Sequence, residues 1–347
     1  MIDEKVLNVV MWSEVFLLVF SVVVFFLHGL WLHLTGKRDA RLTSAGRQCL
    51  VRLLSPEGTQ SPLDTETLRN LPRDIQTTIF LEISRNLAGT GKDQLKRIAR
   101  ETAVFEHARV MCSSRRWTRR LRGARLLAQM DESDPLVKQL LRDRHPAVRA
   151  QATEWAAAQP TTAVLDDLLD LLADPDTLSG FAVQDALLRI GRQAVVPLVR
   201  YLDNHSGSAA VAGLRIASAM AEPAFIPPAV FHSHADLAPV RVAAAHLLGS
   251  VGGVEAAERL ATLVEDPDPD VRAAAAAGLG RMSHWPAASR LAGLLNDDHW
   301  APRRAAALAL RAIGGPGILL LRRSLTSPSQ RVADIAQLAL DMPLAAG

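Results

Sequence analysis

Two short stretches combine residue types that could carry out chemistry. The first, "HSHAD" at residues 232–236, brings two histidines and an aspartate together, and these side chains are common zinc ligands. No third ligand stands nearby in the sequence, and the stretch falls between two expected helices, so a metal site is the weaker interpretation. The second, "GTGKD" at residues 89–93, is similar to a phosphate-binding loop. Such a loop needs a glycine where Asn86 stands and a serine or threonine where Asp93 stands, so no nucleotide site is predicted.

Composition and cysteine usage narrow the choice of function further. The chain has 347 residues, of which 49% are hydrophobic and 22% are charged, and its formal net charge is +3. Its two cysteines, Cys49 and Cys112, are too few for a disulfide framework or a thiolate metal site, and they suit a reducing compartment. We therefore predict no catalytic residue, no cofactor and no metal, and a protein that is not an enzyme.

A recurring arginine sets the spacing of most of the chain. The stretch "DPDPDVRAAAAAGLG", residues 266–280, leads from a turn rich in Asp and Pro into an alanine run without any catalytic group. Its pattern around Arg272 returns at intervals of 28 to 31 residues, and a fixed period of this size is the signature of a repeat array. The arginine recurs at Arg120, Arg149, Arg241, Arg272 and Arg303 and near Arg331, with weaker copies at Gly180 and Ala210.

The elements that must position these arginines are pairs of helices. Each copy predicts a first helix that ends in leucines, a short turn rich in Pro, Asp or Asn, and a second, alanine-rich helix. Apolar residues seven and ten positions after the arginine fall on one stripe, as Leu279 and Met282 do. An acid stands six residues before the arginine, and we expect the acids and arginines of consecutive units to form a charge-assisted ladder. These acids are Asp143, Asp174, Asp266 and Asp297.

The "D-x-D-P-x-V-R-x-A-A-A-x-x-L-G" elements resemble HEAT repeats, in particular the short bacterial type first noted in phycobilisome lyases. The resemblance covers residues 117–347, about eight units, and implies an all-α solenoid of stacked helix pairs with a long concave surface for a partner protein. Repeat scaffolds host many functions. A bilin-lyase-like enzyme or enzyme subunit and a nucleic-acid-binding solenoid therefore remain as alternatives. The His-Glu pairs on which di-iron HEAT hydroxylases depend do not occur in the sequence.

The N-terminal residues predict a membrane anchor. "VFLLVFSVVVFFLHGLWLHL", residues 15–34, has no charged residue and matches the about 20 apolar residues that cross a bilayer as a helix. Basic residues follow this stretch, which predicts an N-terminus outside and a solenoid in the cytoplasm, at the inner membrane. We expect residues 1–36 to form a single transmembrane helix, residues 37–116 a basic helical linker and capping region, and residues 117–347 the solenoid.

Positive charge gathers beside the expected anchor. Residues 37–125 carry 19 Lys and Arg against 9 Asp and Glu, whereas residues 126–347 have a net charge of −5. Three interpretations stay open: a solvated helix face, a site for anionic inner-leaflet lipid or an acidic partner, and a nucleic-acid site with Trp117 as a stacking platform. The candidate basic patch consists of Arg115, Arg116, Arg119, Arg122 and Arg125.

These observations together predict a non-enzymatic, membrane-tethered scaffold whose cytoplasmic solenoid binds a partner protein. Tethering would raise the effective concentration of partners at the inner leaflet. A general resemblance to membrane-tethered bacterial HEAT proteins implies a membrane enzyme as the partner, such as a glycosyltransferase that synthesises polysaccharide. Nucleic acid is the less favoured partner, because the distal part of the array is acidic.

Overall fold

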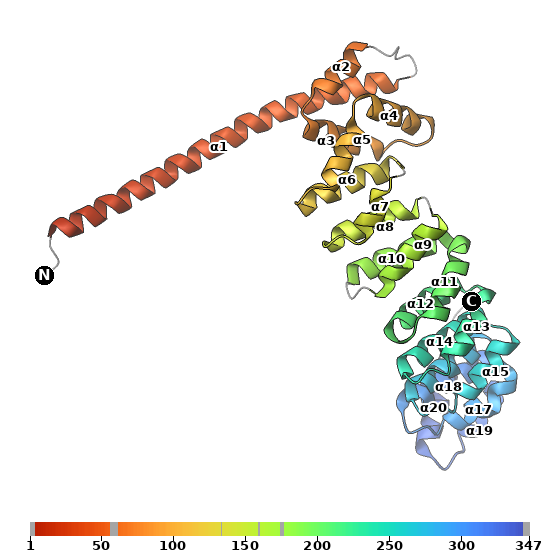
Figure 1. The fold of residues 1–347 in the computed structure, drawn as a ribbon. Helices are drawn as coiled ribbons and strands as arrows, with labels where there is room; N and C mark the ends of the chain where they lie inside the picture. The colour runs from red at the N-terminus through yellow and green to blue at the C-terminus, as the bar shows by residue number, and fades with distance from the viewer. Residues whose placement is uncertain (1–3, 56–61, 133, 159, 174–176, 343–347) are drawn as a thin grey trace. The chain divides into compact units, whose positions relative to one another are not determined.

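The computed structural model describes residues 4–55, 62–132, 134–158, 160–173 and 177–342, and every regular element in these ranges is a helix (Figure 1). The chain divides into two compact units, Met1–Leu136 and Val137–Gly347. We call them unit 1 and unit 2. All the helices of unit 2 from α8 onward belong to the part of the chain in which the arginine recurs.

Unit 1 is built around the end of one long helix. This helix, α1, is 51 residues long and passes through residue 36 without a break. Its last turns pack on α2 and α3, where Leu50, Leu68 and Ile79 are fully buried. The helices of unit 1 are α1 (Glu4–Leu54), α2 (Pro62–Asn70), α3 (Arg73–Ser84), α4 (Thr90–Glu101), α5 (Val104–Cys112) and α6 (Trp117–Gln129), and α7 (Leu136–Leu141) begins at its boundary.

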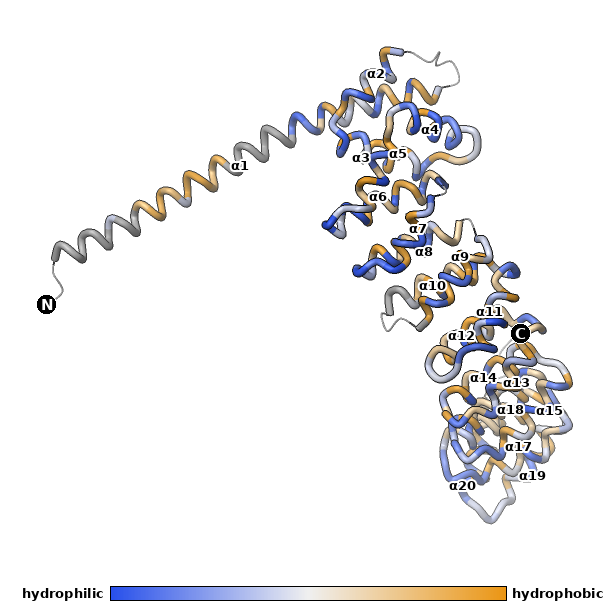
Figure 2. Tube along the Cα trace, in the orientation of Figure 1, coloured by the Kyte–Doolittle hydropathy of each residue, from blue (hydrophilic) through white to orange (hydrophobic). Residues whose placement is uncertain are grey.

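The predicted membrane anchor is corrected by the structure. Among the described residues, no helix is long and apolar enough to cross a membrane. Within α1, the side chains of residues 16–27 are exposed and mostly apolar, and they form the orange segment of this helix in Figure 2. The single-pass placement in the inner membrane was therefore wrong.

One further expectation depended directly on the anchor. The orientation across the membrane is withdrawn with it, whereas the contact of the basic patch with anionic lipid and a membrane enzyme as the partner stay predictions.

Unit 2 is a stack of helix pairs. In each pair a first helix packs on a second helix, and the second helices pack on one another in series from α12 through α14 and α16 to α18. The first helices are α9 (Thr162–Asp170), α11 (Val195–Asn204), α13 (Ile226–His232), α15 (Val254–Leu263), α17 (Ala288–Leu294) and α19 (Gly315–Ser324). The second helices are α8 (Pro146–Ala157), α10 (Thr177–Ile190), α12 (Gly207–Met220), α14 (Ala238–Val251), α16 (Pro269–Arg281), α18 (Trp300–Ile313) and α20 (Gln330–Asp341). Short 3₁₀ turns follow α9 and precede α11, α13 and α17.

Local chemistry explains where the second helices begin and end. At the start of α16, the Asp268 carboxylate accepts hydrogen bonds from the backbone N–H groups of Asp270 and Val271, and Pro269 occupies the first helical position. At the ends of α14 and α18, Gly252 and Gly314 adopt positive φ, a conformation that side chains disfavour.

The alanines and glycines let the second helices approach one another closely. Ala275, in the middle of the alanine run, is fully buried. A Cβ added at Gly280 on α16 would stand 2.7 Å from the Cα of Ala309 on α18, which is closer than two such atoms can approach. The buried part of the alanine run, residues 274–276, is therefore packing surface, and small residues such as Gly280 set the distance between neighbouring second helices.

Candidate binding surface

Two of the recurring arginines, Arg241 and Arg272, connect their own helix pair to the next one. Arg241 on α14 donates from Nε to Asp266 Oδ2 at 2.9 Å and from Nη2 to Asp266 Oδ1 at 2.8 Å. Asp266 lies in the turn between the two helices of the following pair, and only 13% of the Arg241 side chain and 8% of the Asp266 side chain are exposed. Arg272 forms the same bidentate pair with Asp297, at 2.7 and 2.9 Å. Such a fork fixes both the distance and the orientation of the two partners.

The remaining nitrogen of the guanidinium, Nη1, binds the turn that precedes the arginine's own helix. In five copies, Nη1 donates to the backbone carbonyl six residues earlier, at 2.6 to 2.9 Å. The sequence pattern placed an acid at that position. Three of the five copies have an acid there, and for Asp266 and Asp297 the backbone carbonyl serves the arginine of the same unit while the carboxylate serves the arginine of the preceding unit. The five contacts run from Arg120 to Ser114, Arg149 to Asp143, Arg241 to Ala235, Arg272 to Asp266 and Arg303 to Asp297.

The ladder carboxylates are held in their charged form. Burial alone would raise the pKa of Asp266, but the hydrogen bond from Arg241, the backbone N–H of Asp268 and the two neighbouring arginines lower it below its ordinary value. The pKa of Asp297 is lowered in the same way against its burial, chiefly by Arg272 and the backbone N–H of His299. Asp143 receives the equivalent bond from the backbone N–H of His145 at 2.8 Å, and Asp174 lies outside the described residues.

The ladder stops at Arg303. In the next unit Pro328 stands where Asp266 and Asp297 stand in the earlier ones, and Arg303 forms no ion pair with any residue that the structure describes. Its guanidinium instead lies 5.8 Å from the centre of the Trp300 ring, within the range of a cation–π contact. Trp300 remains 54% exposed.

The predicted basic patch in unit 1 separates into two parts. Arg115, Arg116 and Arg119 are exposed around the start of α6. Arg122 turns toward α3, where it donates to the backbone carbonyl of Asp74 at 2.8 Å and to the Thr78 hydroxyl. Arg125 is half-buried and has interactions of its own. The run therefore does not form one continuous face.

The stretches that resembled chemical motifs have structural contacts. His232 is 2% exposed, and its Nε2 lies 2.9 Å from the Leu202 carbonyl oxygen, while His234 Nδ1 lies 3.2 Å from Arg259. Among the described residues, no group of three or more His, Cys, Asp or Glu could hold a metal ion. In "GTGKD", Lys92 forms an ion pair with Asp131 at 2.5 Å.

Neither thiol is arranged for reactivity. Burial raises the pKa of Cys112 to about 12, so this group stays protonated at neutral pH and is a poor nucleophile. Burial, followed by the hydrogen bond and charge of Asp64, also raises the pKa of the Cys49 thiol. Both cysteines are buried and unbridged.

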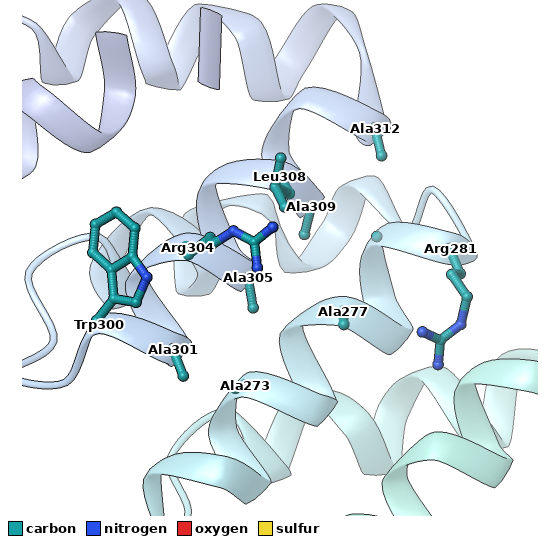
Figure 3. Close-up of a pocket in the computed structure, with 11 residues that line it drawn as sticks. Ala273, Ala277, Arg281, Trp300, Ala301, Arg304, Ala305, Leu308, Ala309 and Ala312 are labelled. Carbon is teal, nitrogen blue, oxygen red and sulfur yellow. The ribbon is translucent and has the colours of Figure 1, made fainter. Parts of the chain in front are cut away.

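A hollow of about 520 Å³ opens between α16 and α18, next to the end of the ladder (Figure 3). We call it the alanine hollow. Small side chains from both helices leave its space open, with Trp300 at one end and Arg304 beside it. Arg281 lies at the other end and extends toward α14, where its Nε donates to the Gly249 carbonyl oxygen at 3.2 Å. The small residues that line the hollow are Ala273, Ala277, Gly280, Ala301, Ala305, Ala309 and Ala312.

A second hollow, of about 510 Å³, continues from the first across α14 to α12 and shares Arg281 with it. Residues that stand one, five and nine positions after the recurring arginine, or after Ala210 in its place, line the two hollows. They are at different positions from the apolar ones seven and ten residues after the arginine. The residues that line the hollows at these spacings of one, five and nine are Val242, His246 and Ser250 on α14, Ala273, Ala277 and Arg281 on α16, Arg304, Leu308 and Ala312 on α18, and Arg215 on α12. We call Arg215, His246, Arg281 and Arg304 the basic stripe.

Sequence reasoning missed the basic stripe because it followed the core-facing positions and the densest run of arginines. The signal was present in the register of the repeat. Residues spaced by four on the second helices share a face, and on α12 to α18 that face carries basic residues and no acid.

Comparisons with known proteins agree with this architecture. The family model for HEAT repeats matches residues 133–215 and 257–341. A search of curated proteins gives no match. The fold is similar to that of Kap121p bound to Pho4p, with a TM-score of 0.50 and 14% sequence identity over 87% of this chain and 41% of that chain.

Two further solved structures are similar at lower scores. One is the karyopherin Kap121p bound to the SUMO protease Ulp1p, with a TM-score of 0.42 and 13% identity over 87% of this chain and 45% of that chain. The other is an engineered protein, with a TM-score of 0.39 and 18% identity over 86% of this chain and 94% of that chain. The chain thus spans less than half the length of Kap121p. It carries HEAT repeats in an all-helical solenoid, and at these identities the likeness concerns the fold alone.

Proposed function

We propose that this protein is a non-enzymatic scaffold that binds a partner protein on the second helices of unit 2. The alanine hollow is the observation that carries the proposal. It is an open apolar site on a stack of helix pairs, and an exposed Trp and an Arg stand at its edge. Tryptophan and arginine are the residues most enriched among those that dominate the binding energy of protein interfaces.

The composition of the surface supports a protein partner. The cores of protein interfaces are depleted in Lys, Glu and Asp and enriched in aromatic residues and Arg. The residues that line the alanine hollow include Trp300, Leu308 and two arginines, and none of them is Lys, Glu or Asp. A similar solenoid, Kap121p, was solved with Pho4p bound, which shows that this architecture accommodates a protein ligand in that case.

Site-specific photo-cross-linking in cells tests the proposal. Trp300 lines the hollow, and Trp285 is exposed on the 3₁₀ turn before α17, outside it, so the two residues offer a matched pair of exposed tryptophans. We expect benzoylphenylalanine at position 300 to attach to one discrete protein, and the same group at position 285 to give no adduct with that protein.

A third variant connects the adduct to the hollow itself. Ala305→Glu places a charged side chain among the alanines and should remove the adduct formed from position 300. Equal adducts from both positions, or an adduct that survives Ala305→Glu, would overturn the proposal.

A further inference from the structure

The helices that carry the basic stripe have many arginines and almost no acids, although unit 2 as a whole is not basic. Asp270 is the one carboxylate in the sequences of α12, α14, α16 and α18. These helices carry arginines at the ladder positions and, in addition, Arg215, Arg281, Arg304 and Arg311. Residues 126–347 as a whole have a net charge of −5, so the acids of this part of the chain lie elsewhere, on other helices and in turns. The four second helices from α12 to α18 therefore carry positive charge with almost no negative charge among it.

The arginines of the stripe differ from the ladder arginines in their partners. Arg215 and Arg304 are exposed, and neither forms an ion pair or a hydrogen bond with a described residue. Arg281 donates to a backbone carbonyl only, and partial burial lowers the pKa of its guanidinium without any carboxylate to offset this. The positive charges of these three arginines therefore have no carboxylate partner among the described residues, and an external anionic group could pair with them.

His246 shows that the positive groups stand close together. Burial lowers the pKa of its imidazole, and the charges of Arg281 and Arg215 lower it further. The three residues come from three successive second helices, and they line the same hollow. Across that hollow the Ser218 and Ser250 hydroxyls are hydrogen-bonded at 2.8 Å. A negatively charged group placed here would offset the charges of the two arginines and would favour the charged form of the imidazole.

The basic stripe does not continue onto α10 and α8, the second helices that precede α12. On α10 the equivalent positions hold Asp185 and Arg189, which pair with each other at 3.0 Å. On α8 the middle position of the stripe is Glu154. The uncompensated positive surface therefore begins at α12 and extends to α18.

The distance across these helices fits a short piece of extended chain. Neighbouring packed helices lie about 9 Å apart, so α12 and α18 are separated by about 27 Å. About eight residues of extended polypeptide, at about 3.3 Å each, span this distance. Side chains of such a segment alternate in direction, so every second one can enter the hollows.

We propose that the basic stripe and the alanine hollow bind an extended acidic segment of a partner protein, which rests on the proposed function above. Carboxylates of the segment pair with Arg215 and Arg304 and lie near His246 and Arg281, and one apolar side chain fills the alanine hollow. The apolar floor favours this ligand over a nucleic acid, whose phosphates would find no donors there.

Binding of a defined probe to the full chain tests the assignment. The probe is a fluorescein-labelled peptide of about eight residues, glutamates around a central leucine, followed by fluorescence anisotropy at low salt. We expect saturable binding that added salt weakens. The double variant Arg215→Gln/Arg304→Gln should raise the Kd about five- to tenfold, since each exposed charge pair contributes modestly.

The matched control removes the same charge from the other face of the solenoid. Arg322 and Arg323 are exposed on α19, a first helix, and Arg322→Gln/Arg323→Gln should leave the Kd unchanged. Absence of binding at low salt, equal weakening by both double variants, or equal affinity for a lysine version of the peptide would overturn the assignment. Tighter binding of a single-stranded oligonucleotide through Arg215 and Arg304 would replace the peptide by nucleic acid.

The two proposals fail separately. Adducts from position 300 without any affinity for the acidic peptide would leave the scaffold function standing and remove the acidic segment. Peptide binding without adducts from position 300 would show an affinity of the stripe for acidic peptides, but would remove the partner protein and with it the assigned segment.

Discussion

Arg241 and Asp266 belong to consecutive helix pairs and are joined by two parallel hydrogen bonds, of 2.9 and 2.8 Å. The same arginine also holds the turn before its own helix through the carbonyl of Ala235. One side chain thus fixes a turn within a unit and the spacing between units. Because Arg272 and Asp297 repeat the arrangement, the second helices stay in register, and the residues of the basic stripe line up from helix to helix.

Loss of one ladder charge should destabilise the whole of unit 2. Asp266→Asn keeps the shape of the side chain but removes the charge that accepts both bonds from Arg241. Hydrogen bonds to charged groups contribute about 1.5–3 kcal/mol, so we expect a loss of about 2 kcal/mol in the free energy of unfolding. Urea unfolding followed by circular dichroism measures it.

The control for this substitution is Asp298→Asn. Asp298 is 93% exposed and pairs with Arg331 only at 3.7 Å, so its loss should change the free energy of unfolding by less than about 0.5 kcal/mol. An equal effect of the two substitutions would mean that the ladder adds no stability.

The ladder should also make the free energy of unfolding of unit 2 fall in a characteristic way at acid pH. The pKa values of Asp266 and Asp297 are lower in the folded protein than their ordinary value of 3.8. A carboxyl group of this kind contributes stability above its ordinary pKa, and the contribution is lost as the pH falls through the lower, folded value. The difference in unfolding free energy between wild type and Asp266→Asn should be constant from pH 5 to 7, the range above both values. It should shrink below pH 3.8, and a pH-independent difference would contradict the assignment.

Replacement by alanine should have opposite effects on stability at two glycines, Gly280 and Gly293. A Cβ at Gly280 would stand 2.7 Å from Ala309 Cα, so Gly280→Ala should force α16 and α18 apart and cost about 1–3 kcal/mol. A Cβ at Gly293, inside α17, would meet nothing within 4 Å, so Gly293→Ala should stabilise the protein by about 0.5–1 kcal/mol through helix propensity. Thermal denaturation of both variants checks the sign of each effect, and a stabilising Gly280→Ala would show that the close approach is absent.

The repeat pattern predicted a large part of the fold. The period gave the helix pairs of unit 2, because each copy carries its own turn residues and core positions. Leu279, seven residues after Arg272, is fully buried, as is Ala275. The acid–arginine spacing indicated a ladder, but only the structure shows that the carboxylate of Asp266 serves the preceding unit while its backbone carbonyl serves its own.

Two features lay beyond the sequence pattern for physical reasons. The apolar N-terminal run met the length rule for a membrane span, yet the described helices contain no span long and apolar enough. The basic stripe consists of single residues on separate helices, so local composition does not reveal it. Arg215, His246 and Arg281 come together only when three second helices pack side by side.

Binding of the acidic peptide should depend on pH through His246. Burial, Arg281 and Arg215 lower its pKa below the ordinary value of 6.5, so the free protein keeps this imidazole neutral at pH 7. Peptide carboxylates would favour the charged imidazole, and the Kd should fall about two- to fivefold as the pH drops from 7.5 toward 5.5. The charged groups facing His246 are arginines, which do not titrate in this range. His246→Gln should remove the pH dependence, and a profile unchanged by this variant would exclude the imidazole.

The most direct test of the binding surface is a scan with photo-reactive residues on its two opposite faces. Benzoylphenylalanine is placed in turn at Val242, Ala273 and Leu308 on the second helices, and at Val196, Val254 and Leu319, which are 67%, 75% and 69% exposed on first helices. Mass spectrometry then identifies the attached peptides. We expect adducts with one partner protein from the second-helix positions alone, through a segment rich in Asp and Glu. Adducts with that protein from the first-helix positions, and none from the second helices, would contradict the proposed binding surface.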